Sequence, residues 1–175
     1  MKKLLLFAAI VIIAGYSTKV MGQVGTVTTT AASTASATIL EGMTLTKGAT
    51  ELNFGSMTVP TAATTVTMSA AGVLSGGTGI ILLTQAPIAS VAAFVVAGTK
   101  GSGYSINLPT ADVDLASGAN HMQVNTFTSN KASNKSTIDG GTGFDNFTVG
   151  AVLNLDNGQP AGSYTGTYNV TVNYN

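Results

Sequence analysis

The chain ends in a stretch, residues 161–175, in which two kinds of side chain alternate. One set is mainly aromatic or aliphatic: Tyr164, Gly166, Tyr168, Val170, Val172 and Tyr174. The other set carries hydroxyls and amides: Ser163, Thr165, Thr167, Asn169, Thr171 and Asn173. Because successive side chains of a strand point to opposite faces, the pattern predicts a β-strand with one apolar face. At about 3.3 Å per residue it would be roughly 40 Å long, which is long for a small domain.

Shorter segments that favour β-strands precede this one; several show the same alternation, and residues 91–97 form a continuous apolar run that favours a central strand. The expected strands lie in residues 39–46, 52–54, 66–68, 73–74, 79–84, 91–97, 104–108, 122–127 and 147–155. Glycine-rich turns separate them, and no segment after residue 22 has a convincing apolar period of 3.6. The sequence therefore predicts an all-β domain, an antiparallel β-sandwich of about nine or ten strands.

Three local patterns give more specific expectations. Met122, Val124 and Phe127 break their own alternation, which favours a β-bulge. The tripeptide Asp156-Asn157-Gly158 indicates a turn, and we expect a hairpin that pairs the terminal strand with residues 147–155. Residues 129–145 are polar and glycine-rich, and they are the best candidate for a long surface loop.

The first 22 residues are typical of a secretory signal peptide. Lys2 and Lys3 precede an apolar run, residues 4–14, and small residues follow before Gln23. An eleven-residue helix spans about 16 Å, roughly half of a hydrocarbon core of about 30 Å, so a membrane anchor is disfavoured. We expect an exported protein without a membrane span after cleavage, located in the periplasm, at the cell surface or outside the cell.

A Thr/Ala/Ser-rich N-terminal extension, residues 23–37, then leads to the β-sandwich domain, residues 38–175. The extension has no large apolar residue after Val27, so it cannot anchor itself in a core. Its threonines nevertheless permit an extended backbone. Two interpretations stay open: a flexible leader, or a strand donated to a neighbouring subunit.

Charge argues against nucleic-acid binding. Without residues 1–22 the chain keeps four lysines and no arginine against seven acidic residues, a net charge of −3. Affinity for nucleic acid depends on cations that neutralise phosphates, and these are scarce here.

The sequence offers no catalytic constellation. His121 is the single histidine and cysteine is absent, so three-histidine and thiolate metal centres are excluded. The glycine-rich stretches lack a following Lys-Ser or Lys-Thr, and no nucleophile elbow occurs. Asp112, Asp114, Asp139 and Asp145 leave room for at most a weak calcium site. We therefore expect a protein that is not an enzyme and holds no cofactor.

Four segments together resemble a secreted bacterial family, the domain of unknown function 4402. They are Leu52-Asn53-Phe54-Gly55, residues 103–109 (GYSINLP), residues 149–153 (VGAVL), and Gly162 to Gly166 followed by residues 170–174 (VTVNY). The resemblance covers nearly all of the chain after the signal peptide. It implies an exported, immunoglobulin-like sandwich.

The end of the chain is also similar to chaperone–usher pilus subunits. Such subunits end in a strand with a penultimate tyrosine, here Tyr174, and a glycine fourteen residues from the end, here Gly162. The resemblance implies that the final strand borders a groove, which the N-terminal extension of a neighbour fills by strand addition. The candidate assembly edge comprises Gly162, Tyr164, Tyr168, Val170, Val172 and Tyr174.

Two hypotheses of function follow from these patterns. The first is an exported structural protein, a cell-surface or fimbria-like subunit of a Gram-negative-type bacterium, that associates with itself or with a periplasmic chaperone by strand addition. The alternative is a self-complete sandwich whose loops, chiefly residues 129–145, bind a glycan or a protein.

Overall fold

The structure is a computed structural model that describes residues 30–175. The predicted signal peptide and residues 23–29 of the extension lie outside the described residues. The chain divides into two units at Ala37 and Thr38. In the first unit, residues 30–37 are exposed and have no regular secondary structure. The second unit, Thr38–Asn175, holds all the strands described below.

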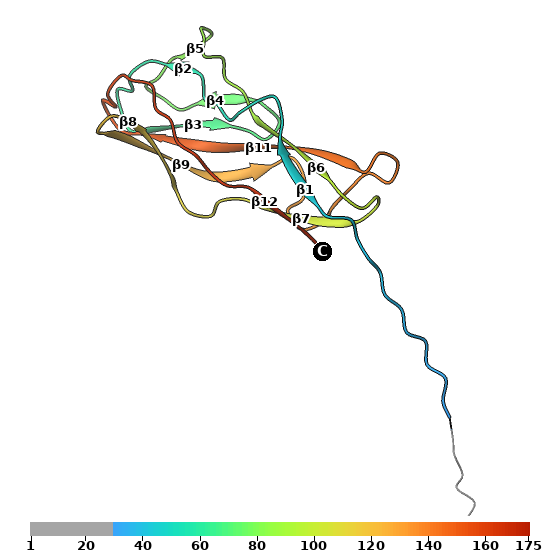
Figure 1. Ribbon diagram of the computed structural model, residues 1–175. Coiled ribbons are helices and arrows are strands. Elements are labelled where there is room, and N and C mark those ends of the chain that lie inside the picture. The colour runs from blue at the N-terminus through green and yellow to red at the C-terminus, as the bar shows by residue number, and fades with distance from the viewer. Residues whose placement is uncertain (1–29) are drawn as a thin grey trace, which may run out of the picture. The chain divides into compact units, whose positions relative to one another are not determined.

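The second unit is built of twelve strands (Figure 1). They are β1 (Thr44–Lys47), β2 (Ser56–Met57), β3 (Thr64–Met68), β4 (Leu74–Gly76), β5 (Leu82–Leu83), β6 (Ala92–Ala97), β7 (Gly103–Asn107), β8 (Val113–Ser117), β9 (Asn120–Ser129), β10 (Ser136–Thr137), β11 (Phe144–Leu155) and β12 (Thr171–Tyr174). Every ladder between them is antiparallel, and residues 30–175 contain no helix. The all-β antiparallel class is confirmed, with more strands than the nine or ten expected because β2, β5 and β10 are only two residues long.

Strand β11 is the centre of a seven-stranded sheet with the order β1-β6-β11-β3-β4, in which β9 pairs with β11 and β8 with β9. Along one edge, β11 pairs first with β6 and then with β3. Its other edge pairs with β9. The predicted alternation explains this position, because Phe147, Val149, Ala151, Leu153 and Leu155 are all buried. Both edges of β11 are therefore occupied.

The predicted bulge in β9 is confirmed. Asn125 pairs with Val152 and Thr128 pairs with Gly150, so β9 advances three residues where β11 advances two. The extra residue is Thr126, whose φ is 51°. The bulge restores Phe127 to the apolar side, where it packs against the core.

The expected terminal hairpin is wrong. Asp156-Asn157-Gly158 does form a turn with φ of 68° at Gly158, but β12 pairs with β7 and not with β11. Before it reaches β7 the chain passes β8, where Thr165 pairs with Ala116. The physical reason is that β11 has no free edge for another strand. The regular terminal strand is correspondingly short, Thr171–Tyr174, and it lies at the side of β7 (Figure 1).

The expected long surface loop, residues 129–145, is also corrected. It contains β10, which pairs with β7 in the three-stranded sheet β10-β7-β12. Ser136 and Ile138 are buried, and Ile138 packs in one core cluster with Tyr104 and Phe147. This apolar side chain ties the segment to the core, and the longest exposed stretches that remain are residues 132–135 and 139–142.

Two apolar clusters form the core. One lies around Val66, Met68, Val124, Leu153 and Leu155. The other lies around Val96, Tyr104, Ile138, Phe147 and Val149, and half-buried residues of the terminal segment pack against it. The first half of β11 supplies Phe147 and Val149 to the second cluster, and its second half supplies Ala151, Leu153 and Leu155 to the first. This single strand therefore connects the two clusters.

Candidate assembly groove

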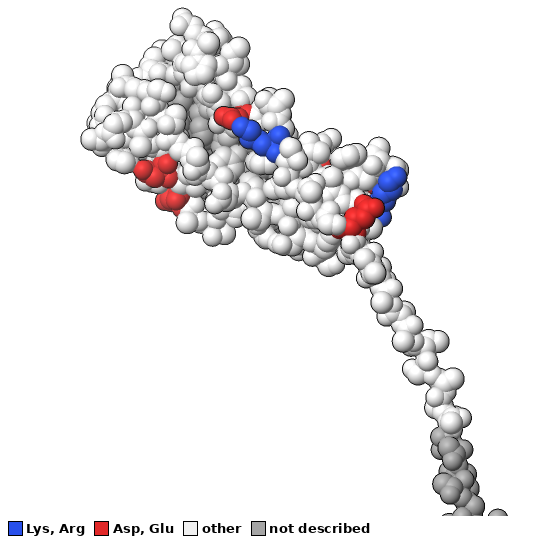
Figure 2. Space-filling view, viewed as in Figure 1, with Lys and Arg blue, Asp and Glu red and all other residues white. Residues whose placement is uncertain are grey.

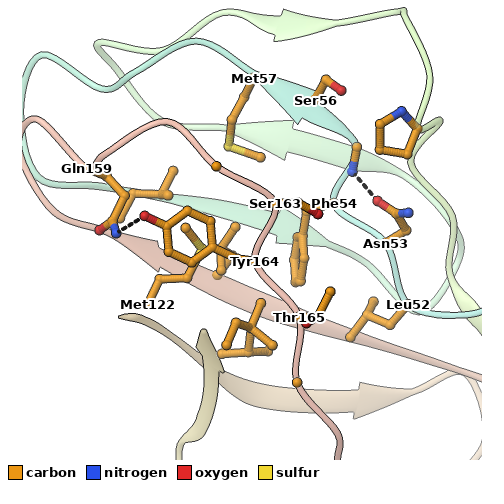
Figure 3. A pocket seen from close by; sticks show the side chains of 18 of the residues that line it. Leu52, Asn53, Phe54, Ser56, Met57, Met122, Gln159, Ser163, Tyr164 and Thr165 are labelled. Atoms are coloured by element: carbon orange, nitrogen blue, oxygen red, sulfur yellow. Dashed lines mark hydrogen bonds between the residues drawn. The ribbon is translucent and has the colours of Figure 1, made fainter. Parts of the chain in front are cut away.

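A groove of about 650 Å³ lies between two segments that are distant in the sequence, residues 51–60 and 159–168 (Figure 3). We call it the assembly groove. Residues 51–60 contain β2, and residues 159–168 connect β11 to β12. The close-up shows Met57 and Ser56 on one side and Gln159 and Tyr164 on the other.

The floor of the assembly groove is made of core side chains. It consists of Val113, Leu115, Met122, Val124, Phe127, Leu153 and Leu155. All seven belong to, or pack against, the cluster around Val66 and Met68. Val124, Leu153 and Leu155 are buried, whereas the other four are half-buried, so the half-buried side chains form the accessible part of the floor.

The first wall uses only one of its two backbone edges for hydrogen bonds. Asn53 exchanges backbone bonds with Ser90, at 2.8 Å each way. Strand β2 pairs with β5, and the Thr58 amide donates to the Ile81 carbonyl at 3.0 Å. All of these partners lie in residues 81–90, on one side of the wall. The other edge of residues 52–58 forms no backbone ladder among the described residues.

The second wall is held by a few specific bonds. Between residues 163 and 168, the backbone is paired only at Thr165, which bonds to Ala116 of β8, among the residues that the structure describes. Gly166 allows the second wall to lie close to β8, because a Cβ atom at this position would collide with the Asp114 carbonyl of β8.

A polar cluster fixes one end of the second wall (Figure 3). The Gln159 side chain is buried and its Nε2 donates to the His121 carbonyl at 3.0 Å and to the Tyr164 hydroxyl at 2.9 Å. The Tyr164 hydroxyl in turn donates to the Pro160 carbonyl at 2.8 Å. These bonds hold the wall in place without a ladder to the adjacent wall.

At the other end of the second wall, two aromatic side chains that line the groove pack against each other. The Tyr168 ring lies 5.0 Å from the Phe127 ring, between centroids. Burial, with a smaller contribution from the charge of Glu51, raises the pKa of the Tyr168 hydroxyl to about 12. Further on, the Tyr174 hydroxyl donates to the Glu41 carbonyl at 2.9 Å and accepts from the Thr99 amide at 2.8 Å.

The residues of the candidate assembly edge divide between two places. Gly162, Tyr164 and Tyr168 line the assembly groove. Val170, Val172 and Tyr174 continue into β12 and pack against the second core cluster, as Tyr168 also does. Strand β12 pairs with β7 along one edge and has no ladder partner along the other within residues 30–175.

Sequence reasoning missed the first wall and the floor. The missed signal is that residues 52–99 contain no Asp, Glu, Lys, Arg or His. Figure 2 shows the result, a face on which charged side chains are few and widely separated. Of the residues that line the assembly groove, Glu51 alone is charged, and Lys47 forms an ion pair with it. The hydrogen bond and charge of Lys47 lower the pKa of the Glu51 carboxyl.

Of the other residues considered for chemistry, His121 and Asp114 contact each other, whereas Asp139 and Asp145 have other partners. His121 Nδ1 is 2.6 Å from a carboxylate oxygen of Asp114 at the exposed end of the β8–β9 hairpin. Asp139 accepts from the amides of Gly141 and Thr142 in its own turn, which lowers the pKa of its carboxyl. Asp145 accepts from Tyr104 and Lys131, at 2.9 Å each. Among the described residues, no three His, Asp or Glu side chains converge as a metal site.

Comparison with known proteins identifies a family. The model of the family described as "Domain of unknown function (DUF4402)" matches residues 43–174. The chain belongs to this family. The match includes both walls and the floor of the assembly groove. No curated protein and no solved structure matches the chain. Within residues 30–175, no helix is long and apolar enough to cross a membrane.

Proposed function

We propose that this protein is an exported, non-enzymatic structural protein, a cell-surface or fimbria-like subunit of a Gram-negative-type bacterium. In this proposal the domain is an immunoglobulin-like sandwich that lacks one strand, and a partner supplies that strand in the assembly groove. The observation that carries the proposal is the combination of an apolar floor with two walls whose inner backbone edges have no ladder partner within residues 30–175.

Elementary energetics favour strand addition at this place. A strand laid between the walls would hydrogen-bond to backbone edges that otherwise depend on water. Its inward side chains would cover apolar floor, a gain of about 25 cal/mol for each Å² removed from water. Unpaired edges beside half-buried apolar side chains are an aggregation hazard unless a specific partner covers them.

The remaining features of the chain agree with an exported subunit. The signal-peptide pattern in residues 1–22 supports transport to the periplasm, the cell surface or the medium. In this proposal a periplasmic chaperone protects the groove before assembly, by the same strand addition. The alternative, a binding module based on residues 129–145, gains no support from the structure, because Ile138 and β10 tie that segment to the core.

The proposal is tested on the chain that begins at Gln23. We expect concentration-dependent oligomers, and we expect Leu115→Glu to abolish them because it puts a charge on the groove floor. The matched control is Val73→Glu, which changes an exposed apolar side chain outside the groove lining. Light scattering after size-exclusion chromatography measures the oligomer size, and a thermal melt establishes that both variants are folded. Equal oligomerisation of folded Leu115→Glu and the parent chain would refute the proposal.

A further inference from the structure

We infer that the outer edge of β5 is a self-association surface, on which β5 of a second copy of this chain pairs antiparallel about a twofold axis at Leu82. The surface lies outside the assembly groove, because no residue between 61 and 86 lines that groove. The inference therefore goes beyond the proposed function and does not depend on it. It starts from residues 80–84, Ile-Ile-Leu-Leu-Thr, which contain β5.

The backbone of this segment is paired along one edge only. The Thr58 amide donates to the Ile81 carbonyl at 3.0 Å, and the Ile81 amide donates to Thr58 Oγ1 at 2.9 Å. Ile81 therefore directs its backbone groups toward β2, and its neighbours Ile80 and Leu82 direct theirs the other way, as does Thr84. On that outer side no strand pairs with β5 within residues 30–175.

The side chains of the segment divide between core and solvent. Ile80 and Leu82 pack against the core cluster around Val66 and Met68. Ile81 and Leu83 alternate with them, and these two side chains are 65% and 41% exposed. The β5 edge therefore combines unpaired backbone groups with exposed aliphatic side chains, which is the surface that pairs most readily with another strand.

The β5 edge lacks the features that protect other edges of this domain. Strand β1 carries Lys47 and β8 carries Asp114, and such charges discourage pairing. Residues 80–84 have neither charge nor proline, and the nearest charged residues in the sequence are Glu51 and Lys100. The end of the domain where Figure 1 labels β5 shows no charged side chain on the visible face in Figure 2. The exposed residues of the edge strands β4, β10 and β12 are small or polar: Ser75, Gly76, Thr137, Thr171 and Asn173.

A second copy of β5 is complementary to this edge. With Leu82 at the axis, the two Leu82 residues exchange both backbone hydrogen bonds. Ile81 of each copy then lies opposite Leu83 of the other, in non-hydrogen-bonded pairs whose side chains approach closely. The same patch thus serves both copies, as an isologous contact requires.

The unpaired backbone favours a strand over a lipid bilayer as the partner. Hydrocarbon offers no hydrogen bonds to the outward amides and carbonyls of Ile80, Leu82 and Thr84. Residues 80–84 also contain no lysine or arginine that would attract anionic headgroups. A second β5 supplies both the hydrogen bonds and the uncharged aliphatic surface.

The contact is small, so we expect a weak dimer. Five residues from each copy bury less than the roughly 1,200–2,000 Å² of a stable interface, and we expect a dissociation constant on the order of hundreds of micromolar. Such a dimer dissociates on dilution during size-exclusion chromatography and leaves the test of the assembly groove unaffected. Where subunits assemble through the groove, many copies of the β5 contact act together and would join assemblies side by side.

The decisive variants place opposite charges at the two residues that face each other. The starting chain begins at Gln23 and carries Leu115→Glu, which removes assembly through the groove. In it, Ile81→Lys and Leu83→Glu should each weaken dimerisation about tenfold or more, since a charge then faces an aliphatic side chain. An equimolar mixture of the two should recover dimers to within about threefold of the starting chain, because the introduced ammonium faces the introduced carboxylate. Sedimentation equilibrium at concentrations up to about 1 mM measures all four samples.

Val73 provides the matched controls, because it is 63% exposed and lies between β3 and β4. Val73→Lys should change dimerisation by less than about threefold, as for an exposed charge. Ile81→Lys mixed with Val73→Glu should not recover dimers, which separates the expected register from a general attraction between opposite charges. Thermal melts establish that every variant is folded.

Cysteine pairing tests the register, and the chain provides a clean background because it has no cysteine. Ile81→Cys chains mixed with Leu83→Cys chains should form a mixed disulfide, since the Cα atoms of such a pair lie about 4.5 Å apart. Ile81→Cys chains alone should form a disulfide much more slowly, because the two copies of residue 81 are diagonal neighbours about 7–8 Å apart.

Three results would overturn the inference. They are a starting chain that stays monomeric at about 1 mM, a mixture of Ile81→Lys and Leu83→Glu that associates no better than either alone, and the absence of the mixed disulfide. Binding to phosphatidylcholine vesicles that Ile81→Lys abolishes, without any effect on dimerisation, would assign the edge to lipid instead.

Failure of this inference is distinguishable from failure of the proposed function. Loss of oligomers in Leu115→Glu without any β5 dimer leaves the assembly groove as the sole contact. If Leu115→Glu has no effect on assembly, the proposed function falls, and the mixed disulfide between Ile81→Cys and Leu83→Cys still decides the inference about β5.

Discussion

At the scale of single residues, Thr126 shows how a strained backbone position serves the groove. A β-branched residue with φ of 51° is unusual, because its Cβ atom crowds the backbone in the left-handed region. The extra residue turns Phe127 toward the apolar side, where it lines the groove and lies against Tyr168. The parity slip between Val124 and Phe127 predicted the bulge, but only the backbone geometry identifies Thr126 as the strained residue.

We expect Thr126→Gly to stabilise the domain by about 0.5–1 kcal/mol, because glycine adopts positive φ without the steric cost and loses only some chain entropy. The midpoint of urea unfolding measures the change. Thr128→Gly is the control: Thr128 lies in the same strand, its φ is not positive, and we expect a loss of stability there. A midpoint for Thr126→Gly below that of the parent would contradict the interpretation of strain.

At the scale of elements, β11 shows that alternation predicts which residues of a strand are buried but not which strands pair with it. The buried positions from Phe147 to Leu155 follow directly from the alternation of apolar residues. The neighbours of β11 do not, because a strand with one apolar face can pair with any other such strand. The same limit explains the incorrect terminal hairpin: the Asn-Gly turn is local chemistry, whereas the occupied edges of β11 are a property of the whole sheet.

At Gly150 the backbone of β11 lies very close to the backbone of residues 68–70. A Cβ atom at this position would collide with the Met68 carbonyl and the backbone of Ser69. We expect Gly150→Ala to destabilise the domain by about 1–3 kcal/mol through forced backbone shifts. Gly140→Ala is the matched control, since Gly140 has open space around its Cβ position and no positive φ, and it should change stability by less than about 0.5 kcal/mol. Urea unfolding of the two variants decides, and equal effects would show that the contact at Gly150 is relieved without cost.

At the scale of the whole molecule, the scarcity of charge makes buried tyrosine hydroxyls the main contributors to the alkaline limit of stability. Burial, and then the hydrogen bond and charge of Asp145, raise the pKa of the Tyr104 hydroxyl above its ordinary value. Burial does the same at Tyr168, to about 12. A raised pKa means that the folded state favours the neutral hydroxyl.

The sign of the pH dependence follows from these shifts. An unfolded tyrosine ionises near about pH 10, so the stabilisation is complete below that pH and is lost as pH rises toward about 12. We expect the free energy of unfolding to fall between pH 10 and 12. In Tyr168→Phe the fall over this range should be smaller than in the parent, because one of the two groups no longer ionises. Denaturant titrations at a series of pH values measure this, and an identical fall in both proteins would contradict it.

The sequence by itself determined the all-β class, the register of buried positions in β7 and β11, and the bulge in β9. Each depends on a period of two or on a turn residue, and both are local properties. Only the tertiary structure decided which strands pair, that Ile138 draws residues 129–145 into the core, and that residues 51–60 lie opposite residues 159–168. The groove lies beside strand edges that have no ladder partner in the part of the chain that the structure describes. Whether an edge has a partner depends on where all the other strands lie, and a local residue pattern does not contain that information.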